Sequence, residues 1–102
     1  DTQKIAGVAA YAVETMVKYA ATELGEFGIR VNAVSGGPID TDALRAFPDY
    51  DEVKAKVEKQ SPLRKMGNPE DLAGAAFFLC DKTQSGWLTG QTIVIDGGTT
   101  FQ

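Results

Sequence analysis

The sequence contains no histidine and a single cysteine, Cys80, and these two shortages exclude several chemistries. Without an imidazole there can be no Ser-His-Asp or Cys-His nucleophile and no histidine metal ligand. One thiol cannot form an intrachain disulfide or a cysteine-rich zinc site, so nothing indicates a secreted, disulfide-stapled scaffold. A reducing cytosol is therefore the expected location.

Runs of positive charge and long apolar stretches are also missing. The 10 Lys and Arg residues are outnumbered by 14 Asp and Glu residues, the formal net charge is −4, and no basic run occurs, so we expect no nucleic-acid partner. The longest apolar stretch, Ala75 to Cys80, is far shorter than the ~20 residues needed to cross a bilayer. We expect a cytoplasmic protein with no membrane partner.

The residue patterns predict alternating helices and strands, which is typical of an α/β protein. In chain order we expect a helix over 5–24, a strand over 29–34, a short helix over 41–47, a charged helix over 51–60, a helix that begins at Pro69 and a strand over 91–95. Glycines at 25 and 28 should end the first helix, and Asn68 should cap the helix that begins at Pro69. Because parallel strands normally have neighbours on both edges, two strands suggest a fragment of a larger domain.

Three sequence blocks, in this order, resemble the C-terminal part of the short-chain dehydrogenase/reductase family. The blocks are G-I-R-V-N-A-V at 28–34, G-P-I-D-T at 37–41, and a run from Pro62 that includes N-P-E-D-L at 68–72, T-G-Q-T at 89–92 and D-G-G at 96–98. The resemblance implies that residues 1–102 are the C-terminal part of one doubly wound Rossmann domain with parallel strands. The glycine-rich dinucleotide loop would then lie upstream, since no such motif occurs here.

A second level of resemblance concerns the residues after the first strand. S-G-G-P-I-D-T-D-A-L at 35–44, followed by F-P at 47–48, is most similar to the enoyl-acyl-carrier-protein reductases of bacterial fatty acid synthesis, in particular the NADPH-using branch. By this resemblance, the nicotinamide of NADPH or NADH would be bordered by Gly37, Pro38, Ile39 and Thr41. A backbone amide such as that of Ile39 would bind the carboxamide. The alternative is that Thr41 only caps a helix and the glycines only form a turn.

The same resemblance implies a mobile substrate lid over about residues 41–61. Ala43, Leu44 and Phe47 would cover the acyl chain of the substrate and exclude water. The alternative is a marginal helix at the protein surface, because the residues that follow Asp51 form only a thin apolar seam.

The catalytic residues are where this sequence departs from the family. Reductases of this family use a tyrosine as proton donor and a lysine four residues later, or seven later in the enoyl reductase branch. When we count back without gaps from Glu23-Leu24, which also match the family, the lysine position falls on Ala10 and the tyrosine position on Ala6 or Gln3. We therefore assign no catalytic residue. Tyr11 and Lys18 are seven apart, but their use requires an eight-residue slip that would turn the helix by about 80°. We interpret them as structural or surface residues.

Four other residues with potential chemistry have simpler interpretations. Asp40 and Asp42 favour capping and solvation over acid-base catalysis. Cys80 is expected to be a small core residue. Trp87 should anchor the loop that leads into the last strand, or pack at a subunit contact.

The family resemblance implies an oxidoreductase that reduces the enoyl double bond of acyl-carrier-protein or CoA thioesters with a nicotinamide cofactor. The parent protein would be a homotetramer, and this chain alone would be inactive. Three alternatives stay open: another short-chain reductase such as a β-ketoacyl reductase, a non-catalytic subunit of a reductase assembly, or a first segment that does not represent the native active-site residues. The sequence leaves open the choice of NADH or NADPH and the acyl-chain length.

Overall fold

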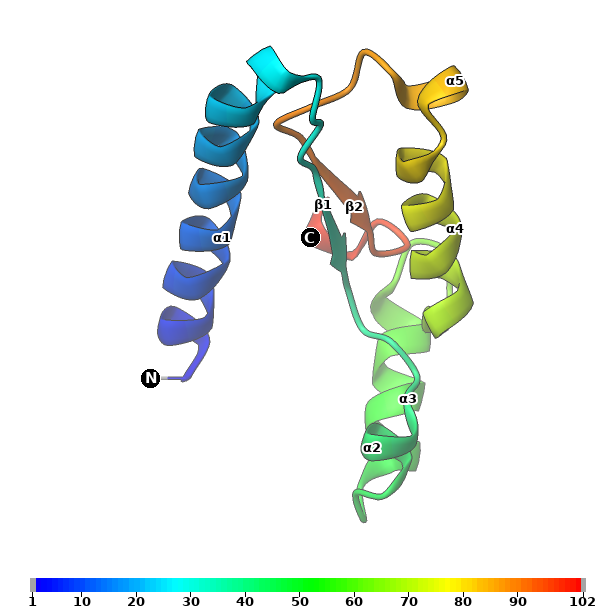
Figure 1. The fold of residues 1–102 in the computed structure, drawn as a ribbon. Helices are drawn as coiled ribbons and strands as arrows, with labels where there is room; N and C mark the ends of the chain where they lie inside the picture. Colours follow the sequence, from blue (N-terminus) through cyan, green and yellow to red (C-terminus); the bar gives the residue numbers. More distant parts are fainter. Residues whose placement is uncertain (1, 102) are drawn as a thin grey trace. The chain divides into compact units, whose positions relative to one another are not determined.

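The computed structural model describes the backbone of residues 2–101 and the side chains of residues 11–100. Its elements, shown in Figure 1, are α1 (Thr2–Leu24), the 3-10 helix η1 (Gly25–Phe27), β1 (Ala33–Gly36), α2 (Asp42–Arg45), α3 (Tyr50–Gln60), α4 (Pro69–Cys80), α5 (Lys82–Ser85), β2 (Thr92–Ile95) and the 3-10 helix η2 (Thr99–Phe101). Each predicted helix and strand is present. The short helix α5 is an addition, and the Asp81 carboxylate caps it by accepting the amide of Thr83 at 3.0 Å.

The two strands are neighbours in one sheet and run in parallel. The amide of Ala33 donates to the carbonyl of Gln91 at 2.9 Å, and the amide of Gly37 donates to the carbonyl of Ile95 at 3.2 Å. Both strands therefore advance by four residues between these two bonds, which an antiparallel pair cannot do. The prediction of a parallel α/β arrangement is confirmed.

The first strand begins later than the predicted range of 29–34. Before β1, side chains interrupt the ladder: the carbonyl of Val31 accepts the amide of Gly90 at 2.7 Å, but the amide of Val31 donates to Thr89 Oγ1 at 3.0 Å and the Asn32 side chain accepts the amide of Gln91 at 3.1 Å. Because these side chains satisfy the backbone groups, regular pairing starts only at the first residue of β1. The strand was predicted, but its bounds were wrong at both ends, since the observed strand is Ala33–Gly36.

The chain divides into two compact units, of which the first comprises Asp1–Ala33 and Phe78–Ile93. Its central side chain is Arg30, whose guanidinium donates to the backbone carbonyls of Leu79, Ser85 and Leu88 at 2.8, 2.9 and 3.3 Å. The carbonyl of Leu79 belongs to the last turn of α4, where carbonyls have no partner within the helix. Arg30 therefore ends α4 and holds the following loop with a single group.

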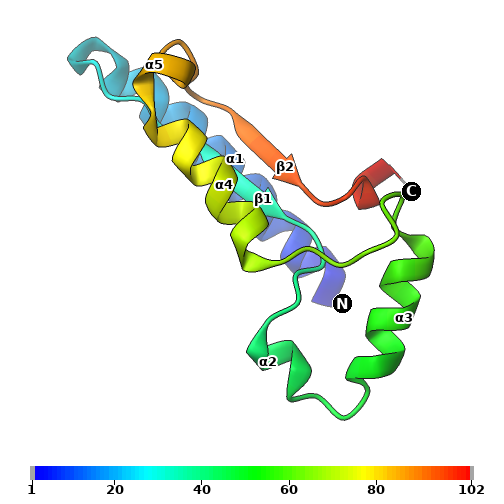
Figure 2. The ribbon, with the colours of Figure 1, turned by 90° about the vertical axis from the view of Figure 1, so that its right-hand side faces the viewer.

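The second unit comprises Val34–Phe77 and Val94–Gln102. Figure 2 shows α2 and α3 as a helix-loop-helix segment, with the loop over 46–49 between the two helices. The end of α3 is attached to the turn after β2, because Ser61 is 1% exposed and the amide of Leu63 donates to the carbonyl of Gly97 at 3.2 Å. Gly98 has a φ of +88°, and a Cβ there would lie 2.8 Å from Pro62 Cγ, so this turn requires glycine for both its backbone and its packing.

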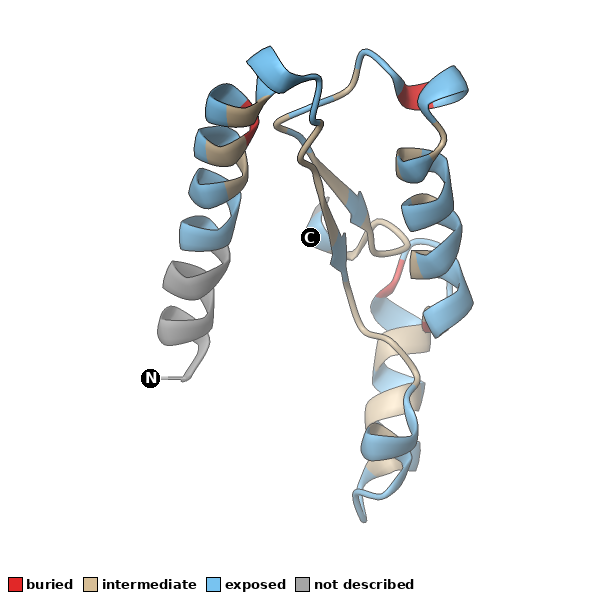
Figure 3. Ribbon diagram, viewed as in Figure 1, coloured by how far each residue is buried: buried red, intermediate tan, exposed pale blue. Residues whose placement is uncertain are grey.

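Few of the described side chains are buried (Figure 3). The apolar ones are Ala21 and Met66, whereas large side chains on α1 and α4 are exposed, among them Met16, Tyr19 and Phe77. The expectation that Cys80 lies in a core was wrong, because α4 has little packed against it within the described residues. Trp87 is 100% exposed and does not anchor the loop before β2, so its alternative, a subunit contact, stays a prediction.

Candidate cofactor loop and lid

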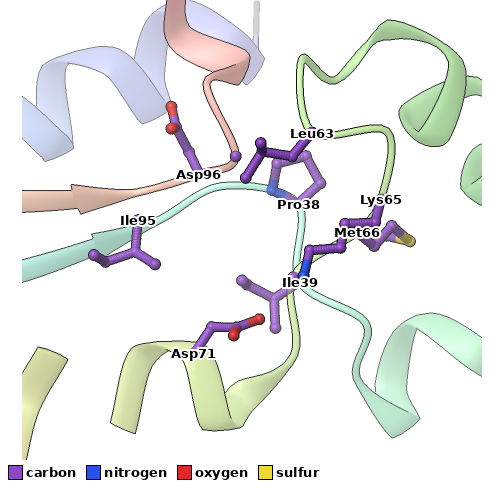
Figure 4. A pocket seen from close by; sticks show the side chains of 10 residues that line it. Pro38, Ile39, Leu63, Lys65, Met66, Asp71, Ile95 and Asp96 are labelled. Carbon is purple, nitrogen blue, oxygen red and sulfur yellow. The ribbon is translucent and has the colours of Figure 1, made fainter. Parts of the chain in front are cut away.

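The predicted cofactor loop leaves the sheet where both strands end. Residues 37–41 follow β1, and the D-G-G turn at 96–98 follows β2. Since the strands are parallel, their carboxyl ends lie at the same edge of the sheet, where open α/β folds place their ligands. A cavity of about 190 Å³ lies at this edge (Figure 4), and its lining residues are Pro38, Ile39, Leu63, Lys65, Met66, Gly67, Asp71, Ile95, Asp96 and Gly97.

Ile39 has the geometry that an amide ligand requires. It forms a parallel bridge with Gly67, in which the amide of Asp40 donates to the carbonyl of Gly67 at 2.8 Å and the amide of Gly67 donates to the carbonyl of Pro38 at 3.0 Å. In such a bridge the middle residue turns its own N–H and C=O to the other side. Neither group of Ile39 has a hydrogen-bond partner among the described residues. A donor and an acceptor are thus presented together, which suits a carboxamide.

The glycines before Ile39 are required by packing within the chain. A Cβ at Gly37 would lie 2.7 Å from Asp96 Cβ, and a Cβ at Gly36 would lie 3.1 Å from Leu72 Cδ1. These contacts favour the alternative in which the glycines shape the loop itself. A direct approach of ligand to the backbone of Gly37 or Pro38 stays a prediction.

Thr41 caps α2, as the alternative interpretation predicted. Its Oγ1 accepts the amide of Leu44 at 3.2 Å. The hydroxyl hydrogen of this exposed residue is still able to donate to a ligand, because the cap uses the oxygen only as an acceptor. The cap and a cofactor contact are therefore compatible.

The predicted lid residues lie on α2 and just after it. Ala43 is exposed, Leu44 is half-buried and Phe47 is 60% exposed. An aromatic ring so exposed, in the loop that follows α2, is available to contact a ligand. In α3, by contrast, the seam residues Val53 and Val57 are both half-buried.

Asp40 has a central position that the sequence analysis missed. Its carboxylate accepts Arg45 Nε at 3.0 Å and Nη2 at 3.3 Å, and the Tyr50 hydroxyl lies 3.0 Å from both carboxylate oxygens. The hydrogen bonds from Arg45 hold the pKa of Asp40 below its usual range against the opposing effect of burial, and Tyr50 adds to the lowering. The signal in the sequence was an arginine and a tyrosine five and ten residues after the aspartate, which is not a helical spacing.

The side chains at the expected catalytic positions, Gln3, Ala6 and Ala10, lie outside the described residues. Tyr11 and Lys18, the pair whose use as catalytic residues would require an eight-residue slip, are both exposed on α1, which agrees with their interpretation as surface residues. Over the part of the chain that the structure describes, no group of three or more potential metal ligands occurs, and no helix has both the length and the apolar content to span a membrane.

Comparison with known proteins shows the family of this chain. A family profile described as Enoyl-(Acyl carrier protein) reductase matches residues 1–100. An uncharacterized oxidoreductase of Mycobacterium tuberculosis is 44% identical over 90% of the chain, and the NADH-dependent enoyl-[acyl-carrier-protein] reductase of Bacillus cereus is 38% identical over 92%. The chain spans 36% of the length of each of these relatives, or about a third.

Solved structures give the same result. A short-chain dehydrogenase family protein from Francisella tularensis superposes with a TM-score of 0.82 at 33% identity, over 93% of this chain and 43% of that one. A 3-oxoacyl-[acyl-carrier protein] reductase with bound NAD from Brucella melitensis has a TM-score of 0.74 at 38% identity, over 86% and 30%. The fold is thus a Rossmann-like α/β fold with parallel strands. The chain belongs to the short-chain dehydrogenase/reductase family.

Proposed function

We propose that this chain supplies the cofactor loop and substrate lid of a nicotinamide-dependent reductase that acts on enoyl thioesters. The observation that carries the proposal is the N–H and C=O of Ile39, which lie after the carboxyl end of β1, have no partner among the described residues and precede an exposed apolar segment. The enoyl reductase family profile and the Bacillus cereus relative support this substrate class.

Each part of the loop has a defined task in this proposal. When bound, the nicotinamide supplies a hydride to the β-carbon of the enoyl thioester. The N–H and C=O of Ile39 orient the carboxamide, and the Thr41 hydroxyl donates to the carboxamide or the pyrophosphate. Ala43, Leu44 and Phe47 cover the acyl chain and keep water from the reacting carbon.

The proposal extends to the partners of the parent protein. The substrate would be a thioester of acyl-carrier protein or CoA, and other polypeptide would supply the dinucleotide loop and the remaining strands. The exposed apolar side chains of α1, including Met16 and Tyr19, support a homotetramer in which this helix is covered.

The choice of substrate is tested with the reductase that contains this chain. We expect it to oxidise NADH or NADPH with crotonyl thioesters and to be much slower with acetoacetyl thioesters. The opposite preference would favour a β-ketoacyl reductase, the second candidate, which is supported by the Brucella melitensis structure. Nicotinamide absorbance measures both reactions.

The departure at the catalytic positions is tested by restoring the family residues. If the missing pair limits the reaction, Gln3→Tyr together with Ala10→Lys should raise kcat by about a hundredfold or more, because a positioned general acid contributes that much. Ala10→Lys alone is the matched control and should give far less. Equal activity of the unmodified chain and the double variant would show that another group donates the proton.

A further inference from the structure

The lid segment is attached to the cofactor loop through one carboxylate. Asp40 stands between the two predicted cofactor-binding residues Ile39 and Thr41, and its amide is fixed by the hydrogen bond to the carbonyl of Gly67 at 2.8 Å. Its side chain is 13% exposed and turns toward the lid. The backbone of Asp40 therefore belongs to the loop, whereas its carboxylate belongs to the lid.

The two partners of this carboxylate bracket the apolar part of the lid. Arg45 ends α2 and Tyr50 begins α3, so the loop over 46–49, with Phe47, lies between the two attachment points. Arg45 binds in a two-pronged manner through Nε and Nη2, a geometry that fixes orientation as well as distance. Tyr50 closes the other end by donating its hydroxyl to the same carboxylate.

No comparable attachment of this loop is made by the neighbouring acidic residue. The Asp42 side chain is 102% exposed, and its Oδ1 lies 3.6 Å from Arg45 Nη1. An exposed pair at that distance contributes little, because water screens it and both side chains lose freedom. The loop is thus held by the carboxylate of Asp40 and not by local negative charge in general.

We propose that Asp40 is a positioning residue: by holding Arg45 and Tyr50 together, it sets where Leu44 and Phe47 stand relative to Ile39. This inference rests on the proposed function, because it assumes that Leu44 and Phe47 contact the acyl chain and that Ile39 contacts the cofactor. Asp40 itself touches neither ligand. Its loss should weaken acyl binding while the cofactor and the chemical step are largely unaffected.

The kinetic test compares isosteric variants in the reductase that contains this chain. Asp40→Asn should raise KM for the acyl thioester about tenfold, since charge-assisted hydrogen bonds are worth about that much. KM for the nicotinamide cofactor should stay within about twofold, as expected when only the acyl contacts are displaced. Asp42→Asn removes the same charge two residues away and should leave both KM values within about twofold.

A double-mutant comparison tests whether Tyr50 acts through Asp40. Tyr50→Phe removes only the hydroxyl and should raise the acyl KM about threefold in the native background, as for one hydrogen bond. In an Asp40→Ala background it should have no further effect, because its partner is gone. The proposal is overturned if Tyr50→Phe costs the same in both backgrounds, if Asp42→Asn matches Asp40→Asn, or if both KM values rise together.

A measurement without substrate separates this inference from the proposed function. Amide hydrogen exchange over residues 42–50 should become about tenfold faster in Asp40→Asn but not in Asp42→Asn, while exchange over 69–80 stays unchanged. If the reductase turns over no enoyl thioester, the proposed function fails but this comparison still decides whether Asp40 holds the segment. Unchanged exchange over 42–50 would overturn the inference whatever the activity.

Discussion

Arg30 and Arg45 show the same guanidinium group at work in two regions of the molecule. Arg30, in the first unit, is half-buried and donates to three backbone carbonyls and to the hydroxyl of Ser85. Arg45, in the second unit, has a side chain that is 54% exposed and is paired with the carboxylates of Asp40 and Asp42.

The difference separates two kinds of contact: the fixed hydrogen bonds of Arg30, which we call the frame, and the ion pair of Arg45, which we call the attachment and which pH and salt can weaken. Backbone carbonyls do not titrate. Removal of Arg30 would delete charge-assisted hydrogen bonds to three of them, although each keeps a second donor: Ser85 Oγ for Leu79, the amide of Leu88 for Ser85, and Asn32 Nδ2 for Leu88. The carboxylate of Asp40 can be protonated, and its exposed arginine partner is screened by salt. Contacts of the first kind suit a part of the fold that stays fixed, and contacts of the second kind suit the proposed substrate lid.

Replacement of the two arginines should give the largest contrast. Arg30→Ala should lower the free energy of unfolding by about 3 kcal/mol, because it removes charge-assisted hydrogen bonds from one guanidinium to three carbonyls. Arg45→Ala should have a clearly smaller effect on unfolding. Denaturant titration of the reductase that contains this chain measures both, and equal losses would remove the distinction between frame and attachment.

Substitution of two glycines, one in the loop that precedes the proposed lid and one in α4, tests whether that loop is as rigid as the frame. Gly37→Ala should destabilise by about 1–3 kcal/mol, the usual cost of overpacking, because the new Cβ would lie 2.7 Å from Asp96 Cβ. Gly74→Ala, at a helical position of α4 with nothing within 4 Å, should stabilise by about 0.5–1 kcal/mol. Thermal unfolding distinguishes the two, and a neutral Gly37→Ala would show that the loop can yield.

Acid should loosen the second region before the first. The pKa of Asp40 is lowered in the folded protein by Arg45 and Tyr50, against the opposing effect of burial, with a smaller lowering by Lys54. The contribution of its carboxylate is thus complete above the ordinary carboxyl pKa of about 4 and is lost as the pH falls through the lowered value. Amide protection factors over 42–50, which correct for the intrinsic slowing of exchange in acid, should fall below pH ~4, ahead of those around Arg30.

The smallest expected effect is that of a simple surface ion pair. Lys54 Nζ lies 3.9 Å from Glu58 Oε1, with both side chains partly exposed. Glu58→Gln should change the free energy of unfolding by about 0.3 kcal/mol at most, and less in high salt. A larger effect in salt-dependent denaturation would mean that exposed pairs in this unit are stronger than the comparison assumes.

The sequence predicted those features that depend on local patterns. Pro69 and the carboxylates after it predicted the start of α4, where Asp71 accepts the amide of Asn68 at 2.8 Å. The β-branched run predicted β2 to within one residue. The start of β1 was wrong because Asn32 pairs with a loop nearly 60 residues away, a contact that no local pattern encodes.

The candidate site divides in the same way. Ile39 was identified through a motif, but the reason for its availability, the bridge to Gly67, needed the fold. Asp40 was assigned to capping and solvation because it and Asp42 lack the separated environments of an acid-base pair and a metal-ligand spacing. Its partners, Arg45 and Tyr50, depend on how the chain turns between α2 and α3. The exposure of Cys80 could not be predicted from the sequence either, because an apolar helix face does not show whether another element covers it.

Trp87 is the only tryptophan of the chain, and its side chain is 100% exposed. An indole in water emits at longer wavelength than one in an apolar surrounding, so the intrinsic fluorescence of this residue reports directly on its surroundings. Any subunit or further polypeptide that comes to rest on it would shift the emission toward the blue and protect it from soluble quenchers. The emission of Trp87 therefore reports whether another polypeptide covers this part of the surface.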